Sequence, residues 1–170
     1  VEFFATLAKK GVRIVIITNS LASTNHKSVH AVYGRHRKPL LEQGVELDEL
    51  RPRSVSMATD TELTLHSKVL TVDRERTFVG SFNLDPRSLY LNTELGVAVD
   101  SERLATDMAT SILDLLPDFA YKLRLSKRRR LEWVLQTGGV EEIITTEPQT
   151  SLWLRFRTWL TGLLPIEGQL

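Results

Sequence analysis

Hydrophobic and polar positions switch between helical and strand-like spacing over the first fifty residues. Residues 1–7 have helical spacing, and residues 12–18 (VRIVIIT) form a nearly continuous apolar run, typical of a strand covered on both faces. A helix from about Val29 to Glu42, capped by Ser28, and an alternating strand over residues 45–50 are predicted next. This β-α-β order indicates an α/β protein, with a sheet that has parallel members and helices on its faces.

The rest of the pattern predicts shorter elements and a helical tail. In chain order these are a hairpin over residues 65–83, a loop over 85–92, a strand over 93–100, a helix from Ser101 to about Leu115 that Pro117 stops, strands over 121–126 and 131–137, and an amphipathic helix over 152–164. His36 falls on the apolar stripe of the second helix, so we expect it to be a core histidine with a satisfied ring.

Composition narrows the class of protein. The chain has 170 residues, of which 42% are hydrophobic, enough for a core. Its net charge of +1 implies no overall attraction to nucleic acid, and the absence of cysteine excludes disulfides and thiolate metal sites. It opens on Val1 within an apparent helix, so we expect a piece of a longer protein. We divide it into a catalytic region, residues 1–147, and a C-terminal amphipathic tail, residues 148–170.

The stretch LHSKVLTVDRERTFVGSFN, residues 65–83, gathers chemically useful side chains on one hairpin. Residues two apart on a strand share a face, so His66 and Lys68 are expected to project together. A four-residue turn that begins at Asp73 would place Lys68 opposite Ser81 and His66 opposite Asn83. All four polar groups would then lie on one face at one end of the sheet.

This set of groups is typical of phosphoryl transfer. A lysine and neutral donors can hold the non-bridging oxygens of a phosphate and stabilise charge in the transition state. The histidine can attack phosphorus or protonate a leaving alkoxide, because an imidazole titrates near neutral pH. Asp73 is expected to fix the turn by accepting hydrogen bonds from nearby backbone N–H groups.

HSKVLTVD followed by GSFN resembles the HKD motif of the phospholipase D superfamily, here within residues 61–88. RSLYLNTELGV, the upstream stretch ITNSLASTN…VHAVYGRHRKPLLEQGVEL and LPIE near the end resemble the C-terminal half of bacterial cardiolipin synthases of the C type. The resemblance implies the fold of that superfamily, a mixed β-sheet sandwiched between helices. It also implies transfer through a phosphohistidine intermediate, without metal or other cofactor.

The resemblance also assigns roles to residues. It implies that His66, Lys68 and Asp73 are the motif residues, that Ser81 and Asn83 line the phosphate site with Lys68, and that Glu94 orients a histidine, often the one in the opposite half. Active sites of the superfamily use two such motifs, and this chain has no second H-x-K-x-x-x-x-D. Either an N-terminal half is missing, or two copies meet about a two-fold axis.

Two further features are candidates for membrane contact. The basic turn Lys127, Arg128, Arg129 and Arg130 suits anionic lipid headgroups, although a solvated hairpin end is an equally ordinary explanation. Trp153 and Trp159 lie on the apolar face of the tail helix, which either lies in a membrane interface or packs as an ordinary terminal helix.

The leading hypothesis is a phosphatidyltransferase that transfers a phosphatidyl group from a second phospholipid to phosphatidylglycerol. It would work at a membrane surface, peripherally on the cytoplasmic side of a bacterial inner membrane. Hydrolysis by the same site would make it a phospholipase D. A small homodimeric nuclease with one motif per chain is the enzyme alternative, although nucleic acid is not the expected partner. A degenerate, non-catalytic half is a third class.

Overall fold

The chain folds into two compact units, and the computed structural model describes residues 2–52, 54–56, 59–62 and 64–164. Unit 1 comprises residues up to Leu65 and from Pro117 to Leu164; unit 2 runs from His66 to Leu116. The end of the expected tail, residues 165–170, with most of LPIE, lies outside the described residues. The α/β class with a C-terminal helix is confirmed.

Unit 1 is built on a mixed five-stranded sheet in the order β1-β2-β8-β9-β10. Its strands are β1 (Val15–Asn19), β2 (Glu46–Leu50), β8 (Ala120–Leu125), β9 (Leu131–Thr137) and β10 (Val140–Ile144). The first two are parallel, as the β-α-β pattern predicted, and the others pair antiparallel. A separate small hairpin is formed by β3 (Ser54–Ser56) and β4 (Thr59–Glu62).

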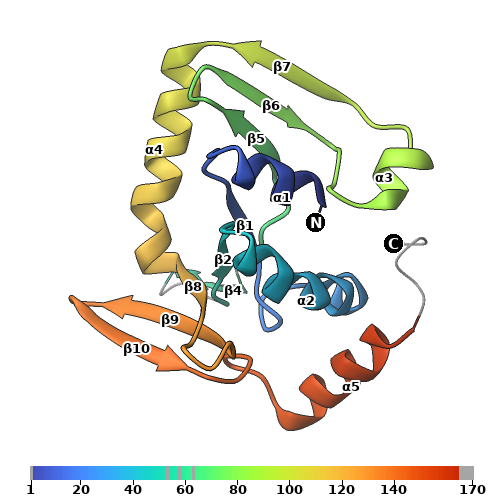
Figure 1. Ribbon diagram of the computed structural model, residues 1–170, viewed down its shortest axis with the longest axis vertical. Coiled ribbons are helices and arrows are strands. Elements are labelled where there is room, and N and C mark those ends of the chain that lie inside the picture. Colours follow the sequence, from blue (N-terminus) through green and yellow to red (C-terminus); the bar gives the residue numbers. More distant parts are fainter. Residues whose placement is uncertain (1, 53, 57–58, 63, 165–170) are drawn as a thin grey trace. The chain divides into compact units, whose positions relative to one another are not determined.

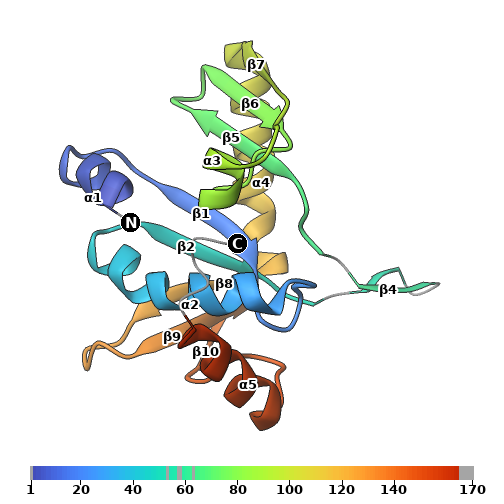
Figure 2. The same ribbon diagram turned by 90° about the vertical axis from the view of Figure 1, so that its right-hand side faces the viewer.

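Helix α2 (Lys27–Glu42) packs against β2 and β8. Helix α5 (Leu152–Gly162) packs in turn on α2 (Figure 1, Figure 2). The third helix of unit 1 is α1 (Glu2–Lys9). The hydrophobic core contains residues of α2, of the loop after it and of strands β2, β8 and β9. These residues are Leu40, Val45, Leu47, Tyr121, Leu123, Trp133 and Leu135.

A buried ion-pair network lies beside this core. Arg37, with 4% of its side chain exposed, has its Nε 2.7 Å from the carboxylate of Glu49, which is fully buried. Arg37 also contacts Glu147 and the ring of His30, and Glu49 accepts a hydrogen bond of 2.9 Å from the indole of Trp133. His30 is therefore the buried histidine of α2. His36 is only partly buried, so the expectation that it lies in the core was wrong.

Unit 2 is a three-stranded antiparallel sheet, β5 (Lys68–Val72), β6 (Arg76–Gly80) and β7 (Gly96–Asp100). Helix α3 (Pro86–Tyr90) occupies part of the predicted loop, because the Asp85 side chain accepts the Ser88 backbone N–H and caps it. Helix α4 (Glu102–Phe119) begins in unit 2 with Ser101 as its predicted cap.

Two helix boundaries differ from the predictions. Helix α2 begins at Lys27, and the preceding His26 makes no side-chain cap, so Ser28 is not the cap. Pro117 does not stop α4, because it lies in the last turn and disturbs only the end of the hydrogen-bond ladder. None of the described helices combines the length and the apolar composition needed to cross a membrane.

Candidate active site

The β5–β6 hairpin positions the motif residues, in a register that differs by one from the prediction. Val72 pairs with Arg76 and Lys68 with Gly80, so Lys68 does not lie opposite Ser81. The turn is shorter because Asp73 and Arg74 both adopt left-handed backbone conformations, with φ of 51° and 57°. Such a conformation is uncommon for an arginine, so this turn could not be predicted from the local sequence.

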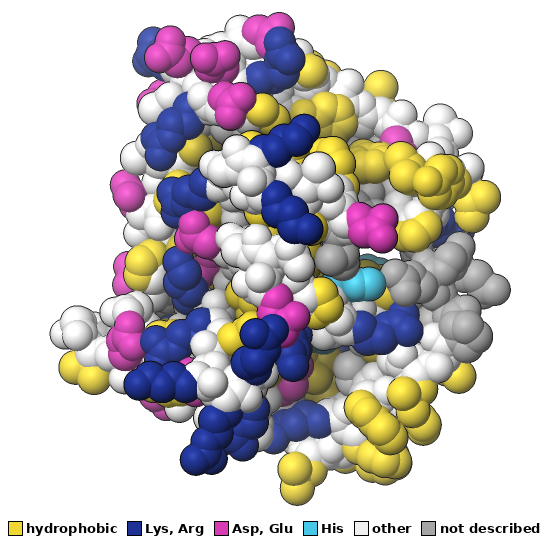
Figure 3. Space-filling view, viewed as in Figure 1, with side chains coloured by type: hydrophobic (Ala, Val, Ile, Leu, Met, Phe, Trp, Pro, Cys, Tyr) yellow, Lys and Arg dark blue, Asp and Glu magenta, His cyan; other side chains and the backbone are white. Residues whose placement is uncertain are grey.

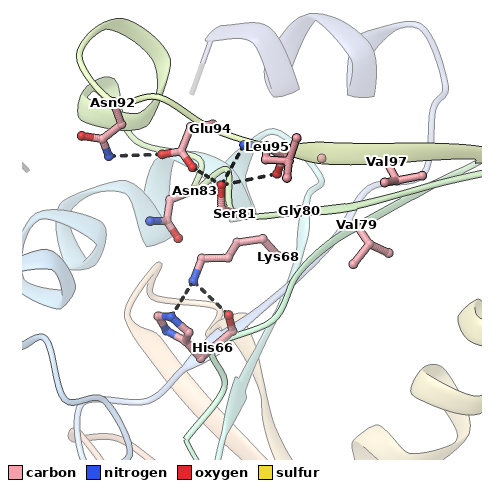
Figure 4. Close-up of a pocket in the computed structure, with 11 residues that line it drawn as sticks. His66, Lys68, Val79, Gly80, Ser81, Asn83, Asn92, Glu94, Leu95 and Val97 are labelled. Atoms are coloured by element: carbon pink, nitrogen blue, oxygen red, sulfur yellow. Dashed lines mark hydrogen bonds between the residues drawn. The ribbon is translucent and has the colours of Figure 1, made fainter.

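The expected polar side chains nevertheless meet at one place. The chain leaves the sheet after Gly80, and a shallow, open pocket of about 650 Å³ forms at that end of the hairpin (Figure 4). His66, Lys68, Ser81, Asn83 and Glu94 all line it. The sheet end therefore brings together the predicted catalytic and phosphate-binding residues except Asp73, which lies in the turn at the other end of the hairpin.

His66 and Lys68 are in direct contact. The ammonium of Lys68 lies 3.1 Å from Nε2 of His66 and donates to the His66 backbone carbonyl at 2.9 Å. Because an ammonium can only donate, Nε2 must be the acceptor, which places the proton of a neutral ring on Nδ1. His66 is exposed, so a phosphate in the pocket could reach both groups.

Glu94 is held by two neighbours in the pocket. Its carboxylate accepts hydrogen bonds from the Ser81 hydroxyl and, at 3.1 Å, from the Asn92 amide. The Ser81 hydroxyl is the main reason why the pKa of the Glu94 carboxyl lies below its ordinary value, so the group is a carboxylate at neutral pH. No bond joins Glu94 to His66 in the described part of the chain, so its expected action on a histidine of this chain is not observed.

The phosphate-binding residues divide into occupied and available donors. The Ser81 hydroxyl donates to Glu94 and accepts the Leu95 backbone N–H at 3.0 Å, so it joins β6 to the start of β7. The amide of Asn83 has no hydrogen-bond partner among the described residues and faces the pocket (Figure 4). Asn83 and Lys68 are therefore the donors best placed for a phosphate oxygen.

Part of the pocket was not predicted. Asn92 was not among the expected site residues, although it lies two residues before Glu94, the spacing at which extended residues share a face. The apolar rim of Val79, Leu95 and Val97 was also missed, because alternation predicts which residues share a face but not which face stays uncovered. Leu70 and Val72, which continue the two-residue spacing of His66 and Lys68 along β5, are 56% and 44% exposed.

Asp73 makes no side-chain hydrogen bond to backbone in the described part of the chain, so its predicted bonding role is not observed; its left-handed backbone shapes the turn.

Among the residues that the structure describes, no group of three or more histidine, aspartate or glutamate side chains is placed to hold a metal ion.

The candidate membrane contacts all belong to unit 1. Arg129 pairs with Glu42 at 2.6 Å, whereas Lys127, Arg128 and Arg130 have no carboxylate partner among the described residues. Trp153 and Trp159 are 66% and 61% exposed. Their predicted role stays a prediction.

Comparison with known proteins identifies the family of this chain. Residues 1–115 match the family described as cardiolipin synthase, PLD-like domain. The chain is 41% identical over 169 residues to cardiolipin synthase C of Escherichia coli (strain K12), an alignment that covers 95% of this chain and 36% of that protein. It is 32% identical over 168 residues to an uncharacterised protein of Helicobacter pylori (strain ATCC 700392 / 26695), covering 96% of the chain and 33% of that protein.

A shorter segment resembles a second type of synthase. Over 45 residues, 26% of the chain, it is 49% identical to cardiolipin synthase A of Proteus mirabilis (strain HI4320). No solved structure matches the chain. The chain spans about a third of the length of the first two curated relatives. With the matched domain and the long alignments together, the chain belongs to the family of cardiolipin synthase, phospholipase D-like domains.

Proposed function

We propose that this chain supplies one of the two histidines of a phosphatidyltransferase that transfers a phosphatidyl group to phosphatidylglycerol and forms cardiolipin. The observation that carries the proposal is the contact of the His66 imidazole with the Lys68 ammonium in an open pocket that Asn83 and Glu94 also line. An imidazole beside a fixed cation suits proton transfer and charge stabilisation at phosphorus. The similarity to cardiolipin synthase C over nearly the whole chain favours a lipid phosphodiester as substrate.

The transfer takes two steps. In the first, a nitrogen of the second histidine attacks phosphorus; the N–P bond forms, the bond to the donor's headgroup alcohol breaks, and His66 gives its proton to the leaving alkoxide. In the second, neutral His66 takes the proton of a phosphatidylglycerol hydroxyl as that oxygen attacks phosphorus, and the N–P bond breaks. Lys68 and Asn83 hold the non-bridging oxygens in both steps.

We assign the acid and base role to His66 because family precedent gives it to the histidine of the C-terminal half. The nucleophilic histidine must then come from a second phospholipase D-like half, either in a longer protein or in a second copy of this chain. An apolar ladder supports this, since the cross-strand neighbours Val69, Val79 and Val97 are 37%, 45% and 61% exposed and two of them line the pocket.

The membrane surface is the proposed partner of unit 1. Helix α5 and the residue after it expose an apolar face of Leu152, Trp153, Phe156, Trp159, Leu160 and Leu163. Figure 3 shows hydrophobic side chains gathered at its lower right, where Figure 1 places α5. Tryptophan and leucine on one face suit the headgroup boundary of a bilayer, and the unpaired cations Lys127, Arg128 and Arg130 suit anionic lipid. The protein would therefore bind its bilayer peripherally, at the cytoplasmic side of a bacterial inner membrane.

The test is an assay with phosphatidylglycerol vesicles, using this chain and any longer protein that contains it. Cardiolipin production, reduced at least 100-fold by both His66→Ala and Lys68→Met, is expected. Asp114→Asn, at an exposed position on α4, is the control and should keep full activity. Phosphatidic acid as the only product would make the protein a phospholipase D. DNA cleavage by the chain alone would identify a homodimeric nuclease. Either result would overturn the proposal of a transferase.

A further inference from the structure

Asn19, the last residue of β1, forms a two-hydrogen-bond pair with the backbone of Leu65. Its side-chain Nδ2 donates to the Leu65 carbonyl oxygen at 2.8 Å, and its Oδ1 accepts the Leu65 N–H, also at 2.8 Å. Leu65 is the residue directly before His66 in the chain. The asparagine therefore holds both polar groups of the residue that leads into the motif histidine.

The segment that Asn19 holds has no strand of its own. Residues 64–67 lie between β4 and β5 and form no ladder, so their backbone polar groups need other partners. A carboxamide presents one N–H and one C=O side by side, as the edge of a strand does, and Asn19 thus replaces a missing strand neighbour. Its own backbone stays in register with Leu50 of β2.

Two further hydrogen bonds, donated by the hydroxyl groups of Thr64 and Ser23, also hold this segment. The Thr64 hydroxyl donates to the Ser23 carbonyl oxygen at 3.0 Å, and the Ser23 hydroxyl donates to the Leu50 carbonyl oxygen at 3.0 Å. Ser23 is buried, so these bonds are shielded from water. The turn after β1 is therefore fixed both to β2 and to the segment before His66.

We propose that Asn19 is a positioning residue for His66 in the transfer reaction, acting through the Leu65 peptide and not through contact with substrate. This rests on the proposed function. The His66 side chain starts one residue beyond the held peptide, so a shift of that peptide moves the imidazole relative to a bound phosphodiester. Displacing a reacting group by about 1 Å costs roughly 100-fold in rate.

The chemistry of the pair selects asparagine. Aspartate has nearly the same shape but cannot donate, and it would turn an anionic oxygen toward the Leu65 carbonyl oxygen. Alanine loses both bonds. Asn25, exposed in the loop after β1 and without a hydrogen bond among the described residues, offers the same substitution where it should change nothing.

The experiment compares Asn19→Asp, Asn19→Ala and the control Asn25→Asp in the protein that forms cardiolipin from phosphatidylglycerol vesicles. We expect kcat to fall about 10- to 100-fold in both Asn19 variants, with KM within about twofold and Asn25→Asp unchanged. A loss that appears only as less folded protein, with normal kcat for the folded fraction, would show a merely structural role and overturn the proposal.

A second readout does not depend on activity. The Leu65 amide hydrogen should exchange at least about 10-fold faster in Asn19→Ala, and the His66 ring signals in the NMR spectrum should shift, while neither changes in Asn25→Asp. Unchanged exchange and unchanged ring signals overturn the inference even if the wild type is inactive. A wild type that makes no cardiolipin overturns the proposed function alone.

Discussion

The ring of Phe78 lies directly over the α-carbon of Gly96, on the neighbouring strand. A Cβ added at Gly96 would lie 2.2 Å from the Phe78 ring, much closer than two carbon atoms can approach. Gly80, which pairs with Gly96, is similarly tight: a Cβ there would lie 2.6 Å from the Leu95 carbonyl oxygen. Both glycines line the pocket, so the sheet end that carries the candidate active site is closely packed from this side.

We therefore expect Gly96→Ala to lower the free energy of unfolding by about 1 to 3 kcal/mol, because the phenylalanine ring must leave its position. Urea unfolding measures the loss. Phe78→Leu in the same chain should recover part of it by making room. The matched control is Gly34→Ala within α2, where a Cβ meets nothing within 4 Å and alanine should stabilise by about 0.5 to 1 kcal/mol.

Arg37→Met should be among the most destabilising single changes in unit 1. It leaves the fully buried Glu49 carboxylate, and the largely buried Glu147, without their cation. Breaking such a pair from one side costs about 3 to 5 kcal/mol. Urea unfolding should show this loss, whereas Arg103→Met, at a side chain 93% exposed, should change stability by no more than about 0.5 kcal/mol. A loss below 1 kcal/mol for Arg37→Met would contradict the assigned network.

Stability should depend on pH through Asp48 on β2. Burial, with a smaller contribution from Glu46, raises the pKa of Asp48 to about 6, from an ordinary value of 3.8. Because the folded protein holds this proton more tightly than the unfolded chain, protonated Asp48 favours folding relative to the ionised form. This contribution to the free energy of unfolding is complete below pH 3.8 and is lost as the pH rises through 6. Asp48→Asn removes this loss, so the variant should match the wild type near pH 4 and exceed it by about 1 to 2 kcal/mol at pH 8.

Unfolding free energies of the two proteins at pH 4 and pH 8 provide the measurement. Asp114→Asn serves as the control at an exposed carboxyl. An equal gain for Asp48→Asn at both pH values would mean that its benefit does not come from titration.

The exposed face of α5 should determine affinity for lipid. Replacing Trp153 and Trp159 together with serine removes two aromatic rings from this face and should weaken binding to phosphatidylglycerol vesicles at least about 10-fold. Vesicle sedimentation measures it. Phe3→Ser, at an equally exposed aromatic on α1, is the control and should bind normally. Binding unchanged in the double variant would leave α5 as a packing helix of unit 1.

Much of the fold could be predicted, because its signals are local. The β-α-β opening, the β8–β9 hairpin around Lys127–Arg130 and the Ser101 cap each follow from the spacing of a few neighbouring residues. The boundary at Lys27 could not be predicted, since the chain enters α2 without a capping side chain. The burial of His30 depends on Arg37, Glu49 and Glu147 meeting from distant parts of the chain, which no local pattern records.

The side chains that meet in the pocket could be predicted, but their bonding could not. The motif and the family resemblance named His66, Lys68, Asn83 and Glu94, and these four line one pocket. Their catalytic roles stay a prediction. The hairpin register was wrong because two non-glycine residues take left-handed conformations in the turn. The partner of Ser81 was also unforeseen, since the bond to Glu94 joins residues from separate strands whose relative position depends on that register.

The division into two units has a consequence for the order in which the protein forms during synthesis. The sheet of unit 2 joins strands that are close neighbours in sequence, and the whole of it emerges from the ribosome before β8 does. The sheet of unit 1 stays open until β8 arrives, because Leu47 pairs with Leu123. Contacts between residues close in sequence form faster than contacts between residues far apart in sequence. The nascent chain can therefore complete the hairpin with His66 and Lys68 while β2 still has an unpaired edge.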